Sequence, residues 1–244
     1  MIEQTRGIVL RSIKYGETSL IVNIFTERYG VVAYLVQGVR NAKAKQQRAG
    51  LLQPATLLDL TVYHKPGKNL QRIREYQPAY IYQNLQEEVV KNSIALFSVE
   101  VLLKLLPEQA PMPEVFDFVI EYFKALDKLP VSGTGNFPIY FIAQLSRFLG
   151  YEIQGAFSAE TPHLNLQEGA FTASTPSVKP FVSDDDARAL SELLNTEEFS
   201  KLDKVELNSA ARFRLLDWYI EFLHQHTQHM GSIKSLAVLQ AILH

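Results

Sequence analysis

Four positively charged side chains lie close together in one short segment of this 244-residue sequence. Between Gly38 and Gly50 the chain carries cations and no acidic residue, and most other positions there are Ala, Asn or Gln. The cations are Arg40, Lys43, Lys45 and Arg48. Such charged heads must stay in water or meet an anion, because burying an unpaired charge is costly. The segment therefore predicts a basic arm, and a nucleic-acid backbone is the simplest anionic partner for it.

A second group combines cations with an aromatic ring at the end of the same region. Its members are Lys65, Lys68, Arg72, Arg74 and Tyr76. The last three occupy every second position, so in a regular strand they share one face, with Ile73 on the other. Cations beside an aromatic ring on a sheet can follow phosphates and stack a base. An ordinary solvent-covered sheet face is an equally good interpretation of the same pattern.

Short strands and tight turns are expected to position both groups. Residues 19–25 and 56–63 alternate between apolar and polar, and 31–36 is an apolar run. Gly30 can adopt the positive φ that the turn before 31–36 requires. Pro66-Gly67 fits a type II turn, after which the chain should return antiparallel. Five short strands ahead of residue 80 predict a small closed barrel, with the basic arm as its long connection.

Beyond residue 80 the apolar residues recur at three- and four-residue steps, which indicates helices. One helix should follow a capping box at Asn84, another should begin at Pro113, and Asn136 should cap a third. A stretch rich in Gly, Pro and small polar residues interrupts this pattern and favours short β pieces. The sequence therefore predicts an α+β chain, β then α. Its parts are a barrel at 1–80 and a helical domain at 81–244 with an irregular insertion at 151–182.

Charge is divided unevenly between these parts. Residues 1–80 hold twelve Lys and Arg against five Asp and Glu, a net +7, and the totals of 24 and 26 leave 12 against 21, a net −9, for the remainder. The basic part suits a polyanion, although unevenly distributed surface charge is the alternative. With no signal-like start and no run of about 20 apolar residues, we expect a cytoplasmic protein that does not enter the membrane.

No set of catalytic groups emerges from the sequence. Phosphate-loop, GxSxG and HExxH patterns are missing, and the absence of cysteine excludes thiol nucleophiles and thiolate metal sites. Three consecutive acids, 184–186, are best explained as favourable charges at the start of a helix. We therefore expect no enzymatic activity, no catalytic residue and no metal or other cofactor.

Several short motifs, taken in order, resemble the RecO family of bacterial DNA-repair proteins. They are Gly7-Ile8-Val9-Leu10, Tyr15-Gly16-Glu17-Thr18-Ser19, Gln37-Gly38-Val39-Arg40, Gly50-Leu51-Leu52-Gln53-Pro54, Phe148-Leu149-Gly150-Tyr151 and Ile233-Lys234-Ser235-Leu236. The resemblance covers essentially the whole chain, and its most specific part is the first 54 residues. It implies an N-terminal OB-fold followed by a helical domain, in agreement with the pattern of strands and helices.

The resemblance also implies a recombination mediator. Such proteins bind single- and double-stranded DNA, anneal complementary strands and, with RecR, help load RecA onto strands coated by single-strand-binding protein. RecF is a further candidate partner. For the terminal carboxylate of a partner's tail, Arg147, Arg212 and Arg214 are candidates. An adaptor or RNA-binding module without annealing activity remains the alternative, and a nuclease would need a carboxylate cluster or a metal.

Many members of the family hold zinc with four cysteines in the insertion. This sequence has no cysteine, and His163 alone cannot hold a structural zinc, so zinc should be absent. Residues 162–166 beside 167–171 are expected to form a hairpin in place of the metal-held knuckle.

Overall fold

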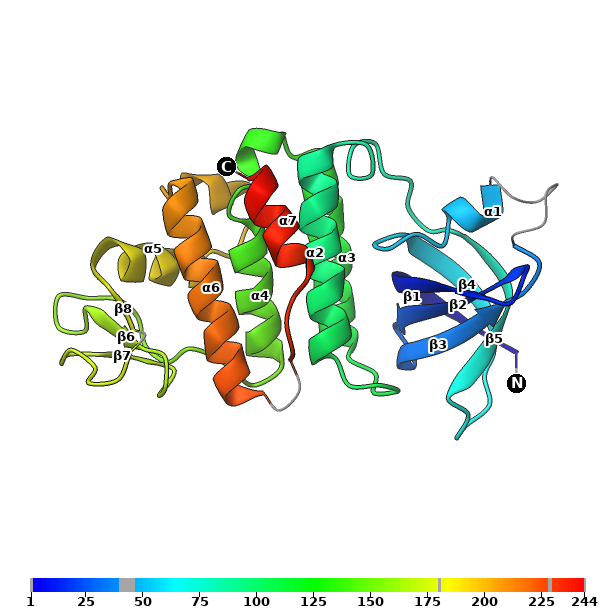
Figure 1. The fold of residues 1–244 in the computed structure, drawn as a ribbon, viewed down its shortest axis with the longest axis horizontal. Helices are drawn as coiled ribbons and strands as arrows, with labels where there is room; N and C mark the ends of the chain where they lie inside the picture. Colours follow the sequence, from blue (N-terminus) through cyan, green and yellow to red (C-terminus); the bar gives the residue numbers. More distant parts are fainter. Residues whose placement is uncertain (1, 40–46, 180, 228–229, 244) are drawn as a thin grey trace. The chain divides into compact units, whose positions relative to one another are not determined.

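The computed structural model describes residues 2–39, 47–179, 181–227 and 230–243 (Figure 1). Contacts within the chain define two compact units. One comprises residues 1–85 with 99–124, and the other 86–98 with 125–244. This division differs from the predicted limits, 1–80 and 81–244, because parts of two helices cluster with the barrel.

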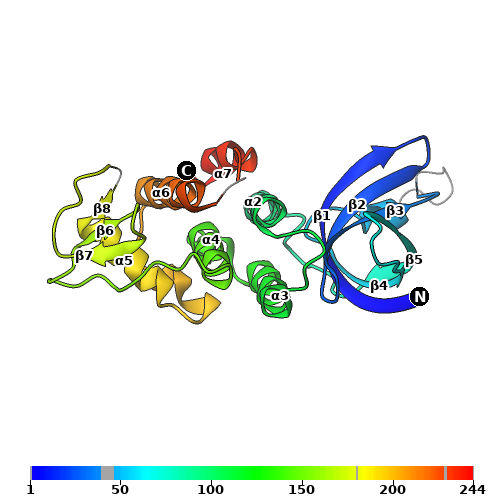
Figure 2. The same cartoon turned by 90° about the horizontal axis from the view of Figure 1, so that it is seen from below.

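The first unit is built on a closed five-stranded barrel, as predicted. Its strands are β1 (Ile2–Tyr15), β2 (Ser19–Thr26), β3 (Gly30–Val36), β4 (Leu57–Tyr63) and β5 (Leu70–Pro78). They close in the order β1-β2-β3-β5-β4, and Figure 2 shows them curving around one another. β3 and β5 are parallel, and the other neighbours are antiparallel. An OB-like barrel of this kind has no free sheet edge to protect.

Apolar side chains fill the interior of the barrel, because every second side chain along a strand points inward. Val22 and Ile24 of β2, Tyr34 of β3 and Val62 of β4 are each 0 % exposed. Gly30 has a φ of 67°, which confirms the positive φ expected before β3. A Cβ at this position would also overlap the backbone of Ala110, so two constraints require glycine.

Beyond the barrel the chain is helical, as predicted. The helices are α2 (Val89–Leu105), α3 (Pro113–Lys128), α4 (Phe137–Phe148), α5 (Asp184–Leu194), α6 (Ser209–His226) and α7 (Ser235–Ile242), with 3-10 turns η1 (Val131–Gly133) and η2 (Phe199–Lys204). The capping box predicted at Asn84 is wrong, because residues 85–87 form a turn and α2 begins only at Val89. Within the described residues no helix is long and apolar enough to cross a membrane.

α4, α5 and α6 pack against one another in the second unit, and Figure 2 shows α4 and α6 side by side. Asn136 precedes α4, but its side chain does not cap the helix, so that expectation is wrong. Its amide nitrogen instead donates hydrogen bonds to the carbonyls of Leu202 and Val205, at 2.7 and 2.9 Å. Asn208, by contrast, caps α6 by accepting from the backbone N–H of Ala211 at 2.9 Å.

The insertion folds as a small antiparallel sheet. The hairpin predicted there is confirmed as β6 (His163–Asn165) and β7 (Ala170–Thr172). A third strand, β8 (Phe181–Ser183), pairs with the other side of β6 and was not predicted. Among the residues that the structure describes, no three His, Cys, Asp or Glu side chains are grouped so that they could hold a metal ion.

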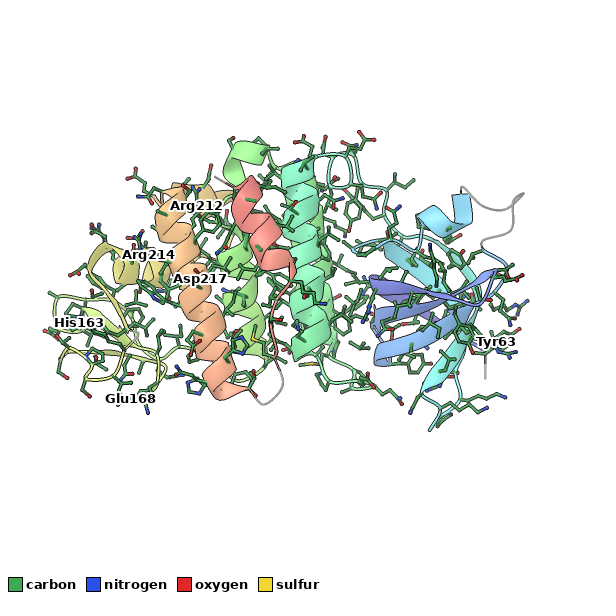
Figure 3. All side chains as sticks on the ribbon, viewed as in Figure 1. Tyr63, His163, Glu168, Arg212, Arg214 and Asp217 are labelled. Atoms are coloured by element: carbon green, nitrogen blue, oxygen red, sulfur yellow. The ribbon has the colours of Figure 1, made fainter. Side chains whose placement is uncertain are left out.

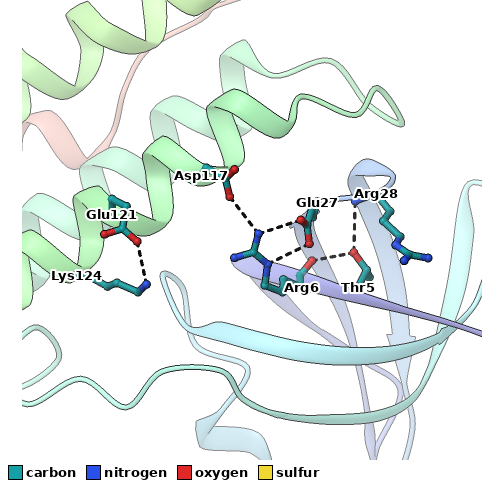
Figure 4. Close-up of polar contacts among 7 residues, drawn as sticks. All are labelled: Thr5, Arg6, Glu27, Arg28, Asp117, Glu121 and Lys124. Atoms are coloured by element: carbon teal, nitrogen blue, oxygen red, sulfur yellow. Dashed lines mark hydrogen bonds and ion pairs between the residues drawn. The ribbon is translucent and has the colours of Figure 1, made fainter.

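An ion network joins the barrel to the part of α3 that belongs to the same unit (Figure 4). The guanidinium of Arg6 donates to both carboxylate oxygens of Glu27, at 3.0 and 2.9 Å, and to Asp117 of α3 at 3.1 Å. It also lies 5.3 Å from the ring centre of Phe116. The hydrogen bonds from Arg6 lower the pKa of the Glu27 carboxyl, while partial burial opposes this shift. Arg6 is thus paired with two carboxylates, which makes it a weaker candidate for binding phosphate than a cation without an acidic partner.

Candidate nucleic-acid interface

The basic arm leaves and re-enters the barrel at fixed points. Arg40, Lys43 and Lys45 lie outside the described residues, and so does the side chain of Arg48, whose backbone belongs to α1 (Gln47–Gly50). On either side of the arm, Val39 and Leu52 are 2 % and 1 % exposed and belong to the barrel core. The Ser12 hydroxyl of β1 also donates to the carbonyl of Leu52. The barrel thus anchors the arm at both ends.

A hollow of about 320 Å³ lies where the arm begins. Residues that lead into the arm line one part of it, and side chains of β4 and β5 line the rest. The full lining is Leu35, Val36, Gln37, Gly38, Val39, Tyr63, Arg72, Ile73, Arg74 and Tyr76. The residues that lead into the arm therefore lie beside the two arginines of β5.

The period-two pattern predicted for the last strand is broken by a bulge. Thr61 and Val62 are adjacent in β4, but they pair with Glu75 and Ile73 of β5. The intervening residue, Arg74, has no partner across the ladder, and a residue added in this way reverses the alternation beyond it.

Arg72, Arg74 and Tyr76 accordingly do not share one exposed face, and that prediction is wrong. Ile73 and Tyr76 both pack against the barrel core, on opposite sides of the bulge. Tyr76 is half-buried and still reaches the hollow at the start of the arm. Arg72 and Arg74 are exposed, as expected of phosphate contacts.

A second hollow, of about 560 Å³, is open on the outer surface of β3, β4 and β5. Its lining combines three cations with apolar and aromatic side chains: Leu35, Tyr63, Lys65, Lys68, Leu70, Gln71 and Arg72. Tyr63 is labelled on the barrel in Figure 3, and sequence reasoning missed it. The alternation of residues 56–63 contained the signal, since it places Tyr63 in the outward phase with Asp59.

The cations around this second hollow are free to bind an anion. Lys65, Lys68 and Arg72 have no ion-pair partner within the described part of the chain. Arg74 differs, because its Nε lies 3.4 Å from the carboxylate of the neighbouring Glu75. An exposed pair of this kind is weak and releases the cation readily. Cations held close together without counter-charges favour phosphates, which release counterions when they bind.

Gln71 holds the hairpin that carries two of these cations. Its side chain is 3 % exposed, and its amide oxygen accepts a hydrogen bond from the N–H of Lys65 at 3.0 Å. Its amide nitrogen donates to the carbonyls of Lys65 and Lys68, at 2.7 and 2.9 Å. One buried amide thereby replaces three water contacts and fixes the turn. No sequence pattern indicates this role, because Gln is ordinarily a surface residue.

Replacing Gln71 by Leu should weaken DNA binding without changing the net charge. The hairpin loses three hydrogen bonds, so Lys65 and Lys68 are no longer held together, and we expect affinity to fall about five-fold. Fluorescence anisotropy with a labelled single strand measures this. Gln77→Leu, an exposed position on the same strand, is the matched control. Equal affinity of the folded Gln71→Leu protein and the control would contradict the role of the clamp.

The three arginines proposed for a partner's tail have different surroundings in the second unit. Arg147 pairs with Glu152 at 3.1 Å, and Arg214 is held by both oxygens of Asp186 at 3.0 and 3.2 Å. Arg212 donates through Nε to Asn136 at 2.9 Å and has no acidic partner in the described regions. Figure 3 labels Arg212 and Arg214 on α6.

Arg212 is the best anion receptor of the three. Partial burial lowers the pKa of its guanidinium, because no carboxylate compensates the lost hydration. Its two terminal nitrogens make no hydrogen bond to a described residue. A Cβ at Gly135 would lie 2.9 Å from the guanidinium carbon, so the group rests directly on the backbone there. A guanidinium fixed through Nε presents its remaining donors in the geometry that suits a carboxylate.

Comparison with known proteins agrees with this architecture. The family model "Recombination protein O N terminal" matches residues 1–82, and "Recombination protein O C terminal" matches residues 86–237. A protein of Azobacteroides pseudotrichonymphae named DNA repair protein RecO is 27 % identical over 246 residues, which cover 99 % of each chain. One of the same name from Bacteroides fragilis is 29 % identical over 244 residues, again covering 99 % of each. In Salinibacter ruber a protein of that name is 33 % identical over 151 residues, 61 % of this chain and 56 % of its own. The chain belongs to the RecO family of DNA repair proteins.

Proposed function

We propose that this protein is a recombination mediator that binds single- and double-stranded DNA and anneals complementary strands. The observation that carries the proposal is the group formed by Lys65, Lys68 and Arg72. These cations have no ion-pair partner in the described part and surround a hollow next to the start of the basic arm. DNA phosphates are the ligand that satisfies both the cations of the barrel and those of the arm.

Annealing follows from charge neutralisation. Two strands repel each other through their phosphates, and a shared basic surface reduces this repulsion as it releases counterions. The bases then approach closely enough to pair. We propose that no bond is made or broken by the protein and that neither a metal nor another cofactor is needed. Every step is binding, alignment or release.

The remaining partners belong to the same proposal. With RecR, the protein would help load RecA onto strands coated by single-strand-binding protein, with RecF as a further partner, in the cytoplasm at the nucleoid. We propose that Arg212 receives the terminal carboxylate of the tail of single-strand-binding protein. The unoccupied donors of its guanidinium support this choice over Arg147 and Arg214, which already pair with acids.

A strand-annealing assay tests the function directly. Two complementary labelled oligonucleotides, bare or coated with single-strand-binding protein, should pair faster when this protein is added without ATP. RecR added to the same samples separates a mediator from a simple annealer. Binding of structured RNA in preference to DNA would favour the RNA-binding alternative. The absence of DNA binding at moderate salt would favour the adaptor alternative, and strand cleavage with magnesium would reveal a nuclease.

A further inference from the structure

We propose that the hollow beside Tyr63 takes up one unstacked base of a single DNA strand, so that the barrel distinguishes single strands from duplex. This inference rests on the proposed function, because it names what one part of the DNA interface recognises. The hollow is the one of about 560 Å³ on the outer surface of β3, β4 and β5.

Strand register places three side chains of different chemistry in one row. Arg72 of β5 pairs with Tyr63 of β4 on one side and with Leu35 of β3 on the other. Directly paired residues project to the same face of a sheet. Arg72 therefore emerges between an aromatic ring and an aliphatic side chain, and Leu70 adds apolar surface at the edge.

Tyr63 is not needed to fill the barrel. Its side chain is 41 % exposed, whereas its neighbour Val62 is fully buried. The Tyr63 hydroxyl makes no hydrogen bond to a described residue. Leu70 is 40 % exposed on the same surface. Both side chains line the same hollow, so their exposed apolar surface is available to a ligand there.

The charges around the row determine what it binds. An apolar ligand alone would leave Lys65, Lys68 and Arg72 without a partner, and a phosphate alone would leave the ring and Leu35 unused. A nucleotide satisfies both groups, because its base stacks on the ring while its phosphates meet the cations. The hairpin fixed by Gln71 holds the two lysines at the rim of the hollow.

Only a strand with an accessible base face can use the hollow. Inside a duplex both faces of each base are covered by stacking, and extruding a base costs unstacking and unpairing energy. A flexible single strand provides an unstacked base at little cost. The arm and the barrel cations would then attract any DNA, and the hollow would add affinity for single strands alone.

Replacing Tyr63 by Ala is the direct test. We expect affinity for a short oligothymidine to fall roughly 5- to 150-fold, the range of one lost base–aromatic stack, and affinity for a blunt duplex to change less than two-fold. Tyr63→Phe should retain the affinity, because the ring remains. Tyr15→Ala is the matched control, since Tyr15 is an exposed barrel tyrosine (54 %) that does not line the hollow.

A second measurement reports the base itself. Substituting 2-aminopurine in the oligonucleotide should give fluorescence that is quenched on binding wild-type and Tyr63→Phe protein and not quenched by Tyr63→Ala. Circular dichroism establishes that the variants fold. Unchanged affinity and quenching in Tyr63→Ala would overturn the inference and leave DNA binding intact. If the wild-type protein binds no DNA, the proposed function itself fails. If a partner protein, not DNA, loses affinity for Tyr63→Ala, the hollow serves a protein ligand and the inference is again wrong.

Discussion

Replacing the four arm cations, Arg40, Lys43, Lys45 and Arg48, by Gln should abolish most of the DNA affinity at moderate salt. Each phosphate contact contributes about 0.9 to the slope of log K against log salt for duplex and about 0.7 for single strands. If all four make contacts, the slope should become shallower by about 3.6 for duplex and by about 2.8 for single strands. If the two proteins bind duplex equally at 1 M salt, the loss for duplex at about 0.1 M salt is about 4,000-fold. Anisotropy titrations over a series of salt concentrations measure both quantities.

A control with the same change in net charge separates the arm from the overall field of the protein. Lys128, Arg188, Lys201 and Lys204 are four cations of the second unit, and replacing them by Gln also removes four charges. Long-range attraction would decline equally in both variants. We expect the control to keep its salt slope. Equal losses in the two variants would show that net charge, and not the arm, governs DNA binding.

The barrel cations should account for a further, smaller part of the salt dependence of DNA binding. When Arg72→Gln is added to the arm variant, the salt slope for duplex should decrease in magnitude by about 0.9, the contribution of one phosphate contact. Arg72 has no ion-pair partner among described residues, so it is free to make such a contact. Arg74→Gln should have a weaker effect, because its guanidinium already lies 3.4 Å from Glu75. This order of effects distinguishes a continuous basic track from an arm that acts alone.

The barrel could be predicted from sequence because its signals are local. Strand alternation requires only neighbouring residues, and the positive φ at Gly30 belongs to a tight turn. The bulge at Arg74 left no comparable signal. Arg74 and Glu75 are both polar, so the sequence does not reveal which of them is the added residue. The face assigned to Tyr76, which lies beyond the bulge, was wrong for that reason.

Long-range hydrogen bonds explain the other differences. Asn136 precedes an apolar helix and resembles an N-cap, but its amide bonds carbonyls of residues 202 and 205, far along the chain. The third strand of the insertion also depends on a distant partner, because β8 is separated from β6 by β7 and a further loop. The outward direction of Tyr63 follows from alternation alone. Its place beside Arg72 does not, because no local pattern relates these two residues before the barrel closes.

Asn136→Ala should destabilise the protein well beyond the loss of an ordinary helix cap. The side chain is 3 % exposed and makes three hydrogen bonds, two as donor to backbone carbonyls and one as acceptor from Arg212. Removing it leaves two buried carbonyls and a half-buried guanidinium without their partner, at about 1–3 kcal/mol for each unsatisfied group. Allowing for relaxation and water entry, we expect the free energy of unfolding to fall by about 3 kcal/mol. Urea denaturation followed by circular dichroism measures it.

Asn208→Ala is the matched control, because Asn208 is an N-cap with a single hydrogen bond to Ala211. Its loss should cost about 1 kcal/mol. Equal losses at the two positions would contradict the role of Asn136 as a hub that connects α4, α6 and the turn at 199–205.

A variant at Arg212 distinguishes an effect on stability from an effect on binding of the tail peptide. Arg212→Ala leaves both bonds from Asn136 to the carbonyls in place, so it should reduce binding of an acidic tail peptide more than it reduces stability. Asn136→Ala should reduce both, because the guanidinium then loses the acceptor that orients it.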